Sequence, residues 1–192
     1  MILVDPDGHT VTFKQDKNTT NEDFAKMKQI YETVKNSTNA DGTKTEVAKM
    51  ADELEASQQV AVVITVLPEP VPVPRRVATA TPTDPGNASV SGKGSGTNIN
   101  ISPNTTGFEN NPIANDPETT MAHELVHAYD NMSGNNRGHQ LDEIHAGDVT
   151  NQFADSKGKN QRAYSGSSSL QQYKNGKAVD MFGSPILLPD EK

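Results

Sequence analysis

Hydrophobic residues recur at helical spacing in two segments near the start of the chain. In residues 24–34 the apolar positions are three or four apart, and Thr19 to Asn21 before them are candidate N-cap residues. A second segment, from Lys44 to Gln58, repeats the spacing and carries charged residues on its other face. The pattern predicts two amphipathic helices that pack against a common core.

Short apolar or alternating runs predict β-strands. Residues 2–4 and 10–13 flank the turn signal Asp5 to Gly8 and predict a β-hairpin. The run Val60 to Leu67 is apolar throughout, which predicts a buried central strand. Residues 97–102 alternate isoleucine with polar side chains, which predicts a half-buried strand.

Proline and glycine dominate the segment between these strands. Six prolines fall between Pro68 and Pro85, and they predict an edge strand or an extended loop, since proline cannot donate to a sheet ladder. Ser89 to Gly96 is rich in glycine and serine, and it predicts a flexible segment with a hairpin turn. We therefore expect one domain over residues 1–192, with a Pro/Gly-rich loop over 68–96 and a flexible tail over 165–192.

The strongest helix signals lie in the second half of the chain. Asp116 is a good N-cap residue, and Pro117 suits the first helical position. The helix is predicted to run to about Met132, before Gly134. Its apolar residues gather on one side, so its other side is available for chemistry.

That other side carries an HExxH motif, from His123 to His127. On a helix this spacing points both imidazoles the same way, so that they can share one zinc ion. Glu124 can then reach a water molecule bound to the metal and act as the general base. The longer metzincin motif is excluded, because Asp130 and Ser133 stand where it requires other residues.

A third metal ligand is expected from a predicted helix over residues 141–153. Glu143 shares its face of that helix with small residues three and four positions on, which would let the two helices approach closely. We therefore expect Glu143 as the third ligand, in a gluzincin-like arrangement. Asp142 and His145 remain alternatives, and an acid that is not a ligand could orient a ligand imidazole.

Composition narrows the function classes. The net charge is -8 and the pI about 5.0, which argues against a nucleic-acid or anionic-membrane partner. The chain has no cysteine, which excludes disulfides and a cysteine-based zinc site. No signal peptide is visible, and the longest apolar run is too short to span a bilayer. Because Met1 begins almost directly on a strand-like run, we expect a domain cut from a longer protein.

Several blocks resemble the NleD-like effector metallopeptidases, which include injected effectors of bacterial secretion systems and C-terminal domains of Rhs-type polymorphic toxins. The resemblance covers most of Phe24 to Tyr164, with departures at Thr150 and Ala154, where the family often has Glu and Arg. The similar blocks are Gly94 to Pro103, Asp116-Pro117, Met121 to Ala128, Asp142-Glu143, Thr150 to Gln152, Gly158 and Arg162 to Tyr164.

The resemblance implies an α+β, zincin-like fold, with a small mixed or antiparallel sheet, N-terminal helices and an HExxH active-site helix. In zincins the strand at the place of residues 97–102 borders the substrate cleft. The implied protein is a zinc endopeptidase that is secreted by a bacterial secretion system and cuts proteins in the target-cell cytoplasm. A cognate immunity protein or a secretion chaperone would be a further partner.

The oxyanion of the reaction needs a donor besides the metal. The resemblance favours Tyr164, while His145, His139 and Arg162 remain candidates. An alternative function is a non-catalytic zinc-binding or protein-interaction domain on the same fold. Glu124 argues against it, because a structural zinc site does not need that residue. A second alternative is a zincin that acts on bacterial rather than host proteins, as an antibacterial toxin.

Overall fold

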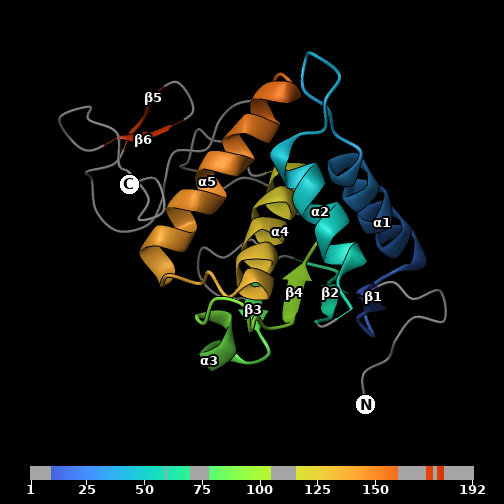
Figure 1. Ribbon diagram of the computed structural model, residues 1–192. Helices are drawn as coiled ribbons and strands as arrows, with labels where there is room; N and C mark the ends of the chain where they lie inside the picture. The colour runs from blue at the N-terminus through green and yellow to red at the C-terminus, as the bar shows by residue number, and fades with distance from the viewer. Residues whose placement is uncertain are drawn as a thin grey trace.

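Four strands form a mixed sheet in the order β1-β2-β4-β3 in the computed structural model of the chain (Figure 1). β1 (Val11–Gln15), β2 (Val62–Val66) and β4 (Thr97–Ile101) are parallel, and β3 (Ala78–Pro82) is antiparallel to β4. The structure describes residues 10–58, 60–69, 78–104, 116–159, 172–174 and 177–179. The expected combination of helices with a small mixed sheet is confirmed.

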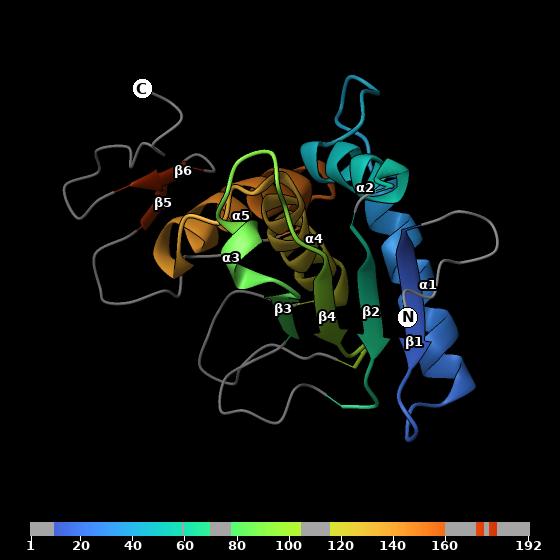
Figure 2. The ribbon, with the colours of Figure 1, turned by 60° about the horizontal axis from the view of Figure 1, so that its bottom comes forward.

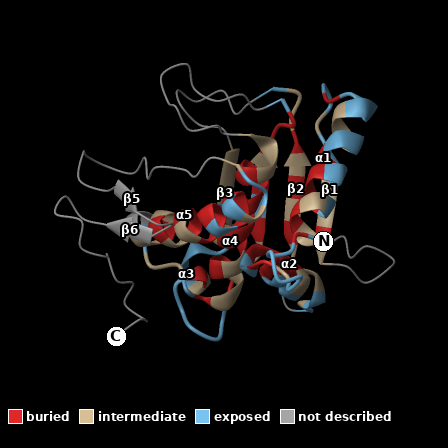
Figure 3. Ribbon diagram, turned by 90° about the horizontal axis from the view of Figure 1, so that it is seen from above, coloured by how far each residue is buried: buried red, intermediate tan, exposed pale blue. Residues whose placement is uncertain are grey.

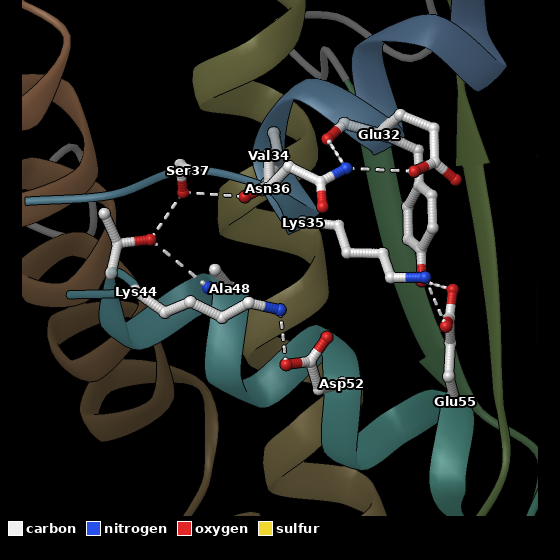
Figure 4. A network of polar contacts seen from close by, with 11 residues as sticks. Glu32, Val34, Lys35, Asn36, Ser37, Lys44, Ala48, Asp52 and Glu55 are labelled. Atoms are coloured by element: carbon white, nitrogen blue, oxygen red, sulfur yellow. Dashed lines mark hydrogen bonds and ion pairs between the residues drawn. The ribbon is translucent and has the colours of Figure 1, made fainter. Parts of the chain in front are cut away.

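The two N-terminal helices form where the hydrophobic pattern predicts them. α1 (Asn21–Lys35) and α2 (Glu46–Ala56) are each capped by a threonine: Thr20 accepts from the backbone N–H of Asp23, and Thr45 from that of Ala48. α2 is shorter than the predicted range of 44–58, because the cap at Thr45 defines its start. The side chains of Lys35 on α1 and Glu55 on α2 form an ion pair between the two helices (Figure 4).

The core lies between one face of the sheet and the helices. Burial alternates along β2, where Val62, Ile64 and Val66 are buried and the two residues between them are only partly covered. β4 alternates in register with β2. α1 and the metal-motif helix α4 (Pro117–Ser133) lie behind the sheet in Figure 2, and the burial colouring of Figure 3 marks their inner faces red. β2 is therefore central as predicted, but only one of its faces is fully buried.

A fifth helix, α5 (His139–Ser156), packs along α4 (Figure 1). Five residues connect the end of α4 to the start of α5, and Gly134 makes that short connection possible. The glycine ends α4 in the left-handed conformation, with φ of 71°. α4 is thus covered by the sheet on one side and by α5 on another, which positions the motif helix from two directions.

One strand prediction stays untested and another needs correction. The first half of the predicted hairpin, residues 2–4, lies outside the described residues, and the second half forms β1, which pairs parallel with β2. β4 was expected to border the substrate cleft, but it is paired on both sides, with β2 and β3. Among the described strands, the sheet edge on this side belongs to β3, because residues 78–82 of the proline-rich segment pair antiparallel with β4.

The described part of the predicted loop over residues 68–96 includes regular secondary structure. It contains β3 and the short helix α3 (Pro85–Ala88), and Ser89 to Gly96 belongs to the connection between the antiparallel neighbours β3 and β4, where a hairpin turn is predicted. Ser95 donates its backbone N–H to the carbonyl of Asn131 at 2.8 Å. A Cβ atom at Gly94 would lie 1.9 Å from the carbonyl oxygen of Met132. Glycine is needed because this loop packs directly on the end of α4.

The C-terminal region contains two short strands, β5 (Gln172–Lys174) and β6 (Lys177–Val179), which pair antiparallel. The remainder of the predicted flexible tail over 165–192 lies outside the described residues. Within the described part of the chain, no helix has the length and apolar character that crossing a membrane would require.

Candidate metal centre

The motif helix α4 has strong signals at both ends. Asp116 caps it by accepting from the backbone N–H groups of Glu118 and Thr119, and Pro117 occupies the first turn. The apolar side predicted from the sequence faces the core. The helix therefore holds His123 and His127 on a rigid, well-anchored element, away from the sheet.

The two histidines converge as their spacing predicts. Nε2 of His127 lies 3.1 Å from Nε2 of His123, and the two rings are nearly perpendicular, with their centroids 4.7 Å apart. Both side chains are largely covered, at 13% and 15% exposed. Two ring nitrogens this close cannot both present lone pairs to each other without repulsion, so the arrangement calls for a proton or a cation between them.

α5 brings a carboxylate to the same place. Glu143 Oε2 lies 3.2 Å from Nε2 of His123, and Glu143 Oε1 lies 3.3 Å from Nε2 of His127. Among the described residues, these three side chains form a group whose potential ligand atoms all lie within 4.8 Å of one another. The close approach depends on buried small residues of α5, Ala146 and Gly147, which present little bulk to α4.

The electrostatics of the group show how strongly the carboxylate and the imidazoles are coupled. Burial raises the pKa of Glu143, but the hydrogen bonds with His123 and His127 outweigh it and hold this pKa well below its usual range. Burial lowers the pKa of His127, but the contact with Glu143 and the nearby charge of Glu124 outweigh it and raise this pKa. The group therefore favours positive charge next to the carboxylate of Glu143.

These residues fit a divalent metal ion. Two imidazole nitrogens and one carboxylate oxygen converge from two helices, and this donor set is the one that His₂Glu zinc sites use. Glu124 directly follows His123 and is 6% exposed, so that a second carboxylate lies beside the group without belonging to it.

The alternatives for the third ligand point elsewhere. Asp142 Oδ1 accepts from the backbone N–H of Arg137 at 2.8 Å, at the start of α5. His145 Nδ1 lies 2.8 Å from Asp130 Oδ2. Neither belongs to the three-residue group. The proposed oxyanion donors Tyr164 and Arg162, and the side chain of His139, lie outside the described residues.

Sequence reasoning did not find two contacts that join α4 to the α5 region. Asp130 was used only to exclude the metzincin motif, although its spacing of three residues from His127 places it on the same face. Lys159, just beyond α5, pairs with Asp116 at 2.8 Å and with Glu118 at 2.6 Å, at the start of α4. No local pattern predicts the latter contact, because it joins residues more than forty positions apart.

Comparison with known families gives one match. The family Peptidase M91, described as effector protein, matches residues 5–163 of the chain, which include the whole three-residue group. Neither the curated proteins nor the solved structures gave a match.

Proposed function

The chain belongs to the Peptidase M91 effector-protein family of NleD-like metallopeptidases, and from that premise we propose that it is a zinc endopeptidase that cuts proteins of a target cell. Membership implies a metallopeptidase, a hydrolase, that acts as an effector. The observation that carries the finer proposal is the convergence of His123, His127 and Glu143, with Glu124 beside the first histidine.

We assign the metal as zinc because of the donor set. Catalytic zinc sites combine three nitrogen or oxygen ligands from the protein with one open position. His123 and His127 from α4 and Glu143 from α5 would supply those three ligands, and the chain has no cysteine that would favour a softer metal. Helix α4 followed by a ligand-bearing second helix is the arrangement of a gluzincin-like fold.

A bound zinc ion lowers the pKa of a coordinated water to about 7 and polarises the scissile carbonyl. Glu124 is the residue of this chain that takes the proton from the attacking water, and it then delivers that proton to the leaving amine. The Glu124 side chain is buried, and its charge raises the pKa of His127, which supports a position of this carboxylate beside the proposed metal group. Tyr164 is proposed to donate a hydrogen bond to the oxyanion, supported by the similarity of Arg162 to Tyr164 to the family tail.

The substrate is proposed to bind as an extended peptide along β3. This strand contacts α4 and forms one edge of the sheet within the described part of the chain. An extended peptide can add to such an edge through main-chain hydrogen bonds. We thus move the predicted role in substrate binding from β4 to β3, since β4 has strand neighbours on both sides.

The effector family supports delivery by a bacterial secretion system and action in the target-cell cytoplasm. The remaining partners are a protein substrate and either a cognate immunity protein or a secretion chaperone. The acidic chain, with a net charge of -8, gives no support to a nucleic-acid or membrane partner. The rival function is a zinc-binding or interaction domain that does not cut proteins. Glu124 distinguishes the two functions, because only the peptidase needs it as a general base.

The decisive experiment expresses the wild-type protein and Glu124→Ala in candidate bacterial and host cells and identifies new protein N-termini by proteomics. We expect termini that occur only with the wild type, because loss of a general base costs about 10²–10⁴-fold in rate. Both proteins should retain zinc by elemental analysis. Zinc binding without new termini in any cell type would favour the non-catalytic domain, and equal cleavage by both proteins would contradict the assigned base.

A further inference from the structure

Helices α4 and α5 share a second polar contact beside the candidate metal centre. Nδ1 of His145, on α5, lies 2.8 Å from Oδ2 of Asp130, on α4. The aspartate side chain is only 3% exposed, whereas the imidazole is 18% exposed. Because an ionised carboxylate has no proton to give, Nδ1–H of the imidazole donates and Asp130 accepts.

On α5, His145 and Glu143 reach α4 from opposite edges of the contact face. Residues two apart on a helix are rotated by about 200°, or about 160° the shorter way around. The side chains that lie between the two on that shorter arc, Asp142, Ala146 and Phe153, are all buried. Rotating α5 about its axis would therefore bring one of these two residues towards α4 and take the other away.

On α4, their partners form a single stripe. His123, His127 and Asp130 lie within about 60° of one another around the helix axis. Glu143 contacts the two histidines, and His145 contacts the aspartate farther along the same stripe. Two contacts at different heights on α4, made from opposite edges of α5, determine both the rotation and the axial register of α5.

We propose that the hydrogen bond between Asp130 and His145 is a positioning contact that holds α5 in the rotation at which Glu143 meets His123 and His127. The buried small residues Ala146 and Gly147 let α5 approach α4 closely, and the hydrogen bond adds to the constraint that larger buried residues such as Phe153 place on this rotation. Asp130 and His145 do not join the three-residue metal group, and they act on it through Glu143. This inference rests on the proposed metal centre.

The test measures zinc affinity by competition with a chromophoric chelator, together with thermal unfolding of the zinc-free protein. Asp130→Ala is preferred to a change at His145, because the imidazole left behind is partly exposed and can bond to water. We expect zinc affinity to fall about 10–100-fold, the usual effect of losing an outer partner of a metal ligand. Asp130→Asn should restore it, since the amide oxygen still accepts from Nδ1–H. If the alanine variant does not fold, Asp130→Leu, which fills the volume, replaces it.

A double variant separates positioning from general support of the fold. In a Glu143→Ala background, Asp130→Ala should cause no further loss of zinc affinity, because the contact acts only through that carboxylate. Lys159→Met is the matched control, since it removes separate ion pairs between a residue just beyond α5 and the start of α4, and it should leave zinc affinity unchanged.

The outcomes divide clearly. Wild-type affinity in the Asp130→Ala protein, or an undiminished effect in the Glu143→Ala background, would overturn the positioning role. If His123→Ala and Glu143→Ala themselves bind zinc as the wild type does, the metal centre is wrong, and the proposed function fails before this inference is reached.

Discussion

The molecule contains two helix pairs that are joined by charged side chains, and the two pairs use their charges differently. Between α1 and α2, Glu55 is contacted by the hydroxyl of Tyr31 at 2.9 Å and by the ammonium group of Lys35 (Figure 4). Between α4 and α5, Glu143 is contacted by the imidazoles of His123 and His127. Each pair thus places one carboxylate from the second helix against two groups of the first.

The partners of Glu55 are both proton donors that hold their protons. Burial, followed by the charge of Glu55, raises the pKa of Tyr31 far above its ordinary value. Burial lowers the pKa of Lys35, but the hydrogen bond to Glu55 outweighs it, so that this pKa is raised as well. The carboxylate between α1 and α2 is satisfied by donors at every physiological pH, and this group has no capacity to bind a metal ion.

The partners of Glu143 can instead give up their protons. An imidazole without its proton offers a lone pair, so two histidines and a carboxylate offer three donors to one cation. A buried carboxylate between two helices, such as Glu55 or Glu143, is thus by itself a structural feature. The chemistry of its neighbours decides whether it can also bind a metal.

The largest expected effect comes from metal removal. Zinc at 1,000 times its dissociation constant should stabilise the wild-type protein by about 4 kcal/mol, because it binds only the folded state. Glu55→Ala should show the same increment, measured as the difference between unfolding with zinc and with a chelator. An increment lost in Glu55→Ala would show that the two helix pairs are not independent.

The next effect is on metal affinity. Glu143→Gln removes the charge of the side chain while preserving its shape. Loss of a residue that only supports a metal ligand lowers metal affinity by at most about 100-fold, and we expect Glu143→Gln to lower zinc affinity by more than that. Asp142→Asn is the matched control, because its carboxylate accepts from the backbone N–H of Arg137, just before α5, and does not belong to the metal group. Isothermal titration with zinc distinguishes the two, and a larger loss in Asp142→Asn would reassign the third ligand.

Breaking the contacts between α1 and α2 should lower stability and leave zinc affinity unchanged. Glu55→Ala leaves the hydroxyl of Tyr31, which is 2% exposed, without this acceptor, and unfolding in urea should show a loss of about 1–3 kcal/mol. Asp52→Ala removes the exposed pair with Lys44 and should cost about 0–1 kcal/mol, because solvent screens that pair. Equal losses of unfolding free energy in Glu55→Ala and Asp52→Ala would mean that the burial of Tyr31 has no influence on the loss.

The smallest effect concerns the ion pairs of Lys159 with Asp116 and Glu118. Lys159→Met should cost about 1 kcal/mol or less at neutral pH. Burial raises the pKa of Asp116, but the hydrogen bond from Lys159 outweighs it, and the net pKa is below the ordinary value of 3.8. A depressed pKa contributes stability above 3.8, which is lost as the pH falls through the folded-state value. The difference in unfolding free energy between Lys159→Met and the wild type should therefore shrink below about pH 4. A difference that grows below this pH would contradict the role of the ion pairs.

Much of the architecture could be predicted because local patterns carry it. The spacing of apolar residues located α1, α2 and α4, and capping residues such as Thr20 and Asp116 marked their starts. The single buried face of β2 and the position of β4 inside the sheet could not be predicted. Both depend on which element pairs with which, and pairing partners here are tens of residues apart.

The sequence by itself determined that His123 and His127 share one side of a helix, because helical periodicity is a local property. It also narrowed the third contributor to a few residues and favoured Glu143 through the small side chains on its face. Only the tertiary structure decided that Glu143 meets both imidazoles, while His145 pairs with Asp130. The physical reason is that the rotation of α5 against α4 is set by packing and polar contacts between distant segments, which no local pattern encodes.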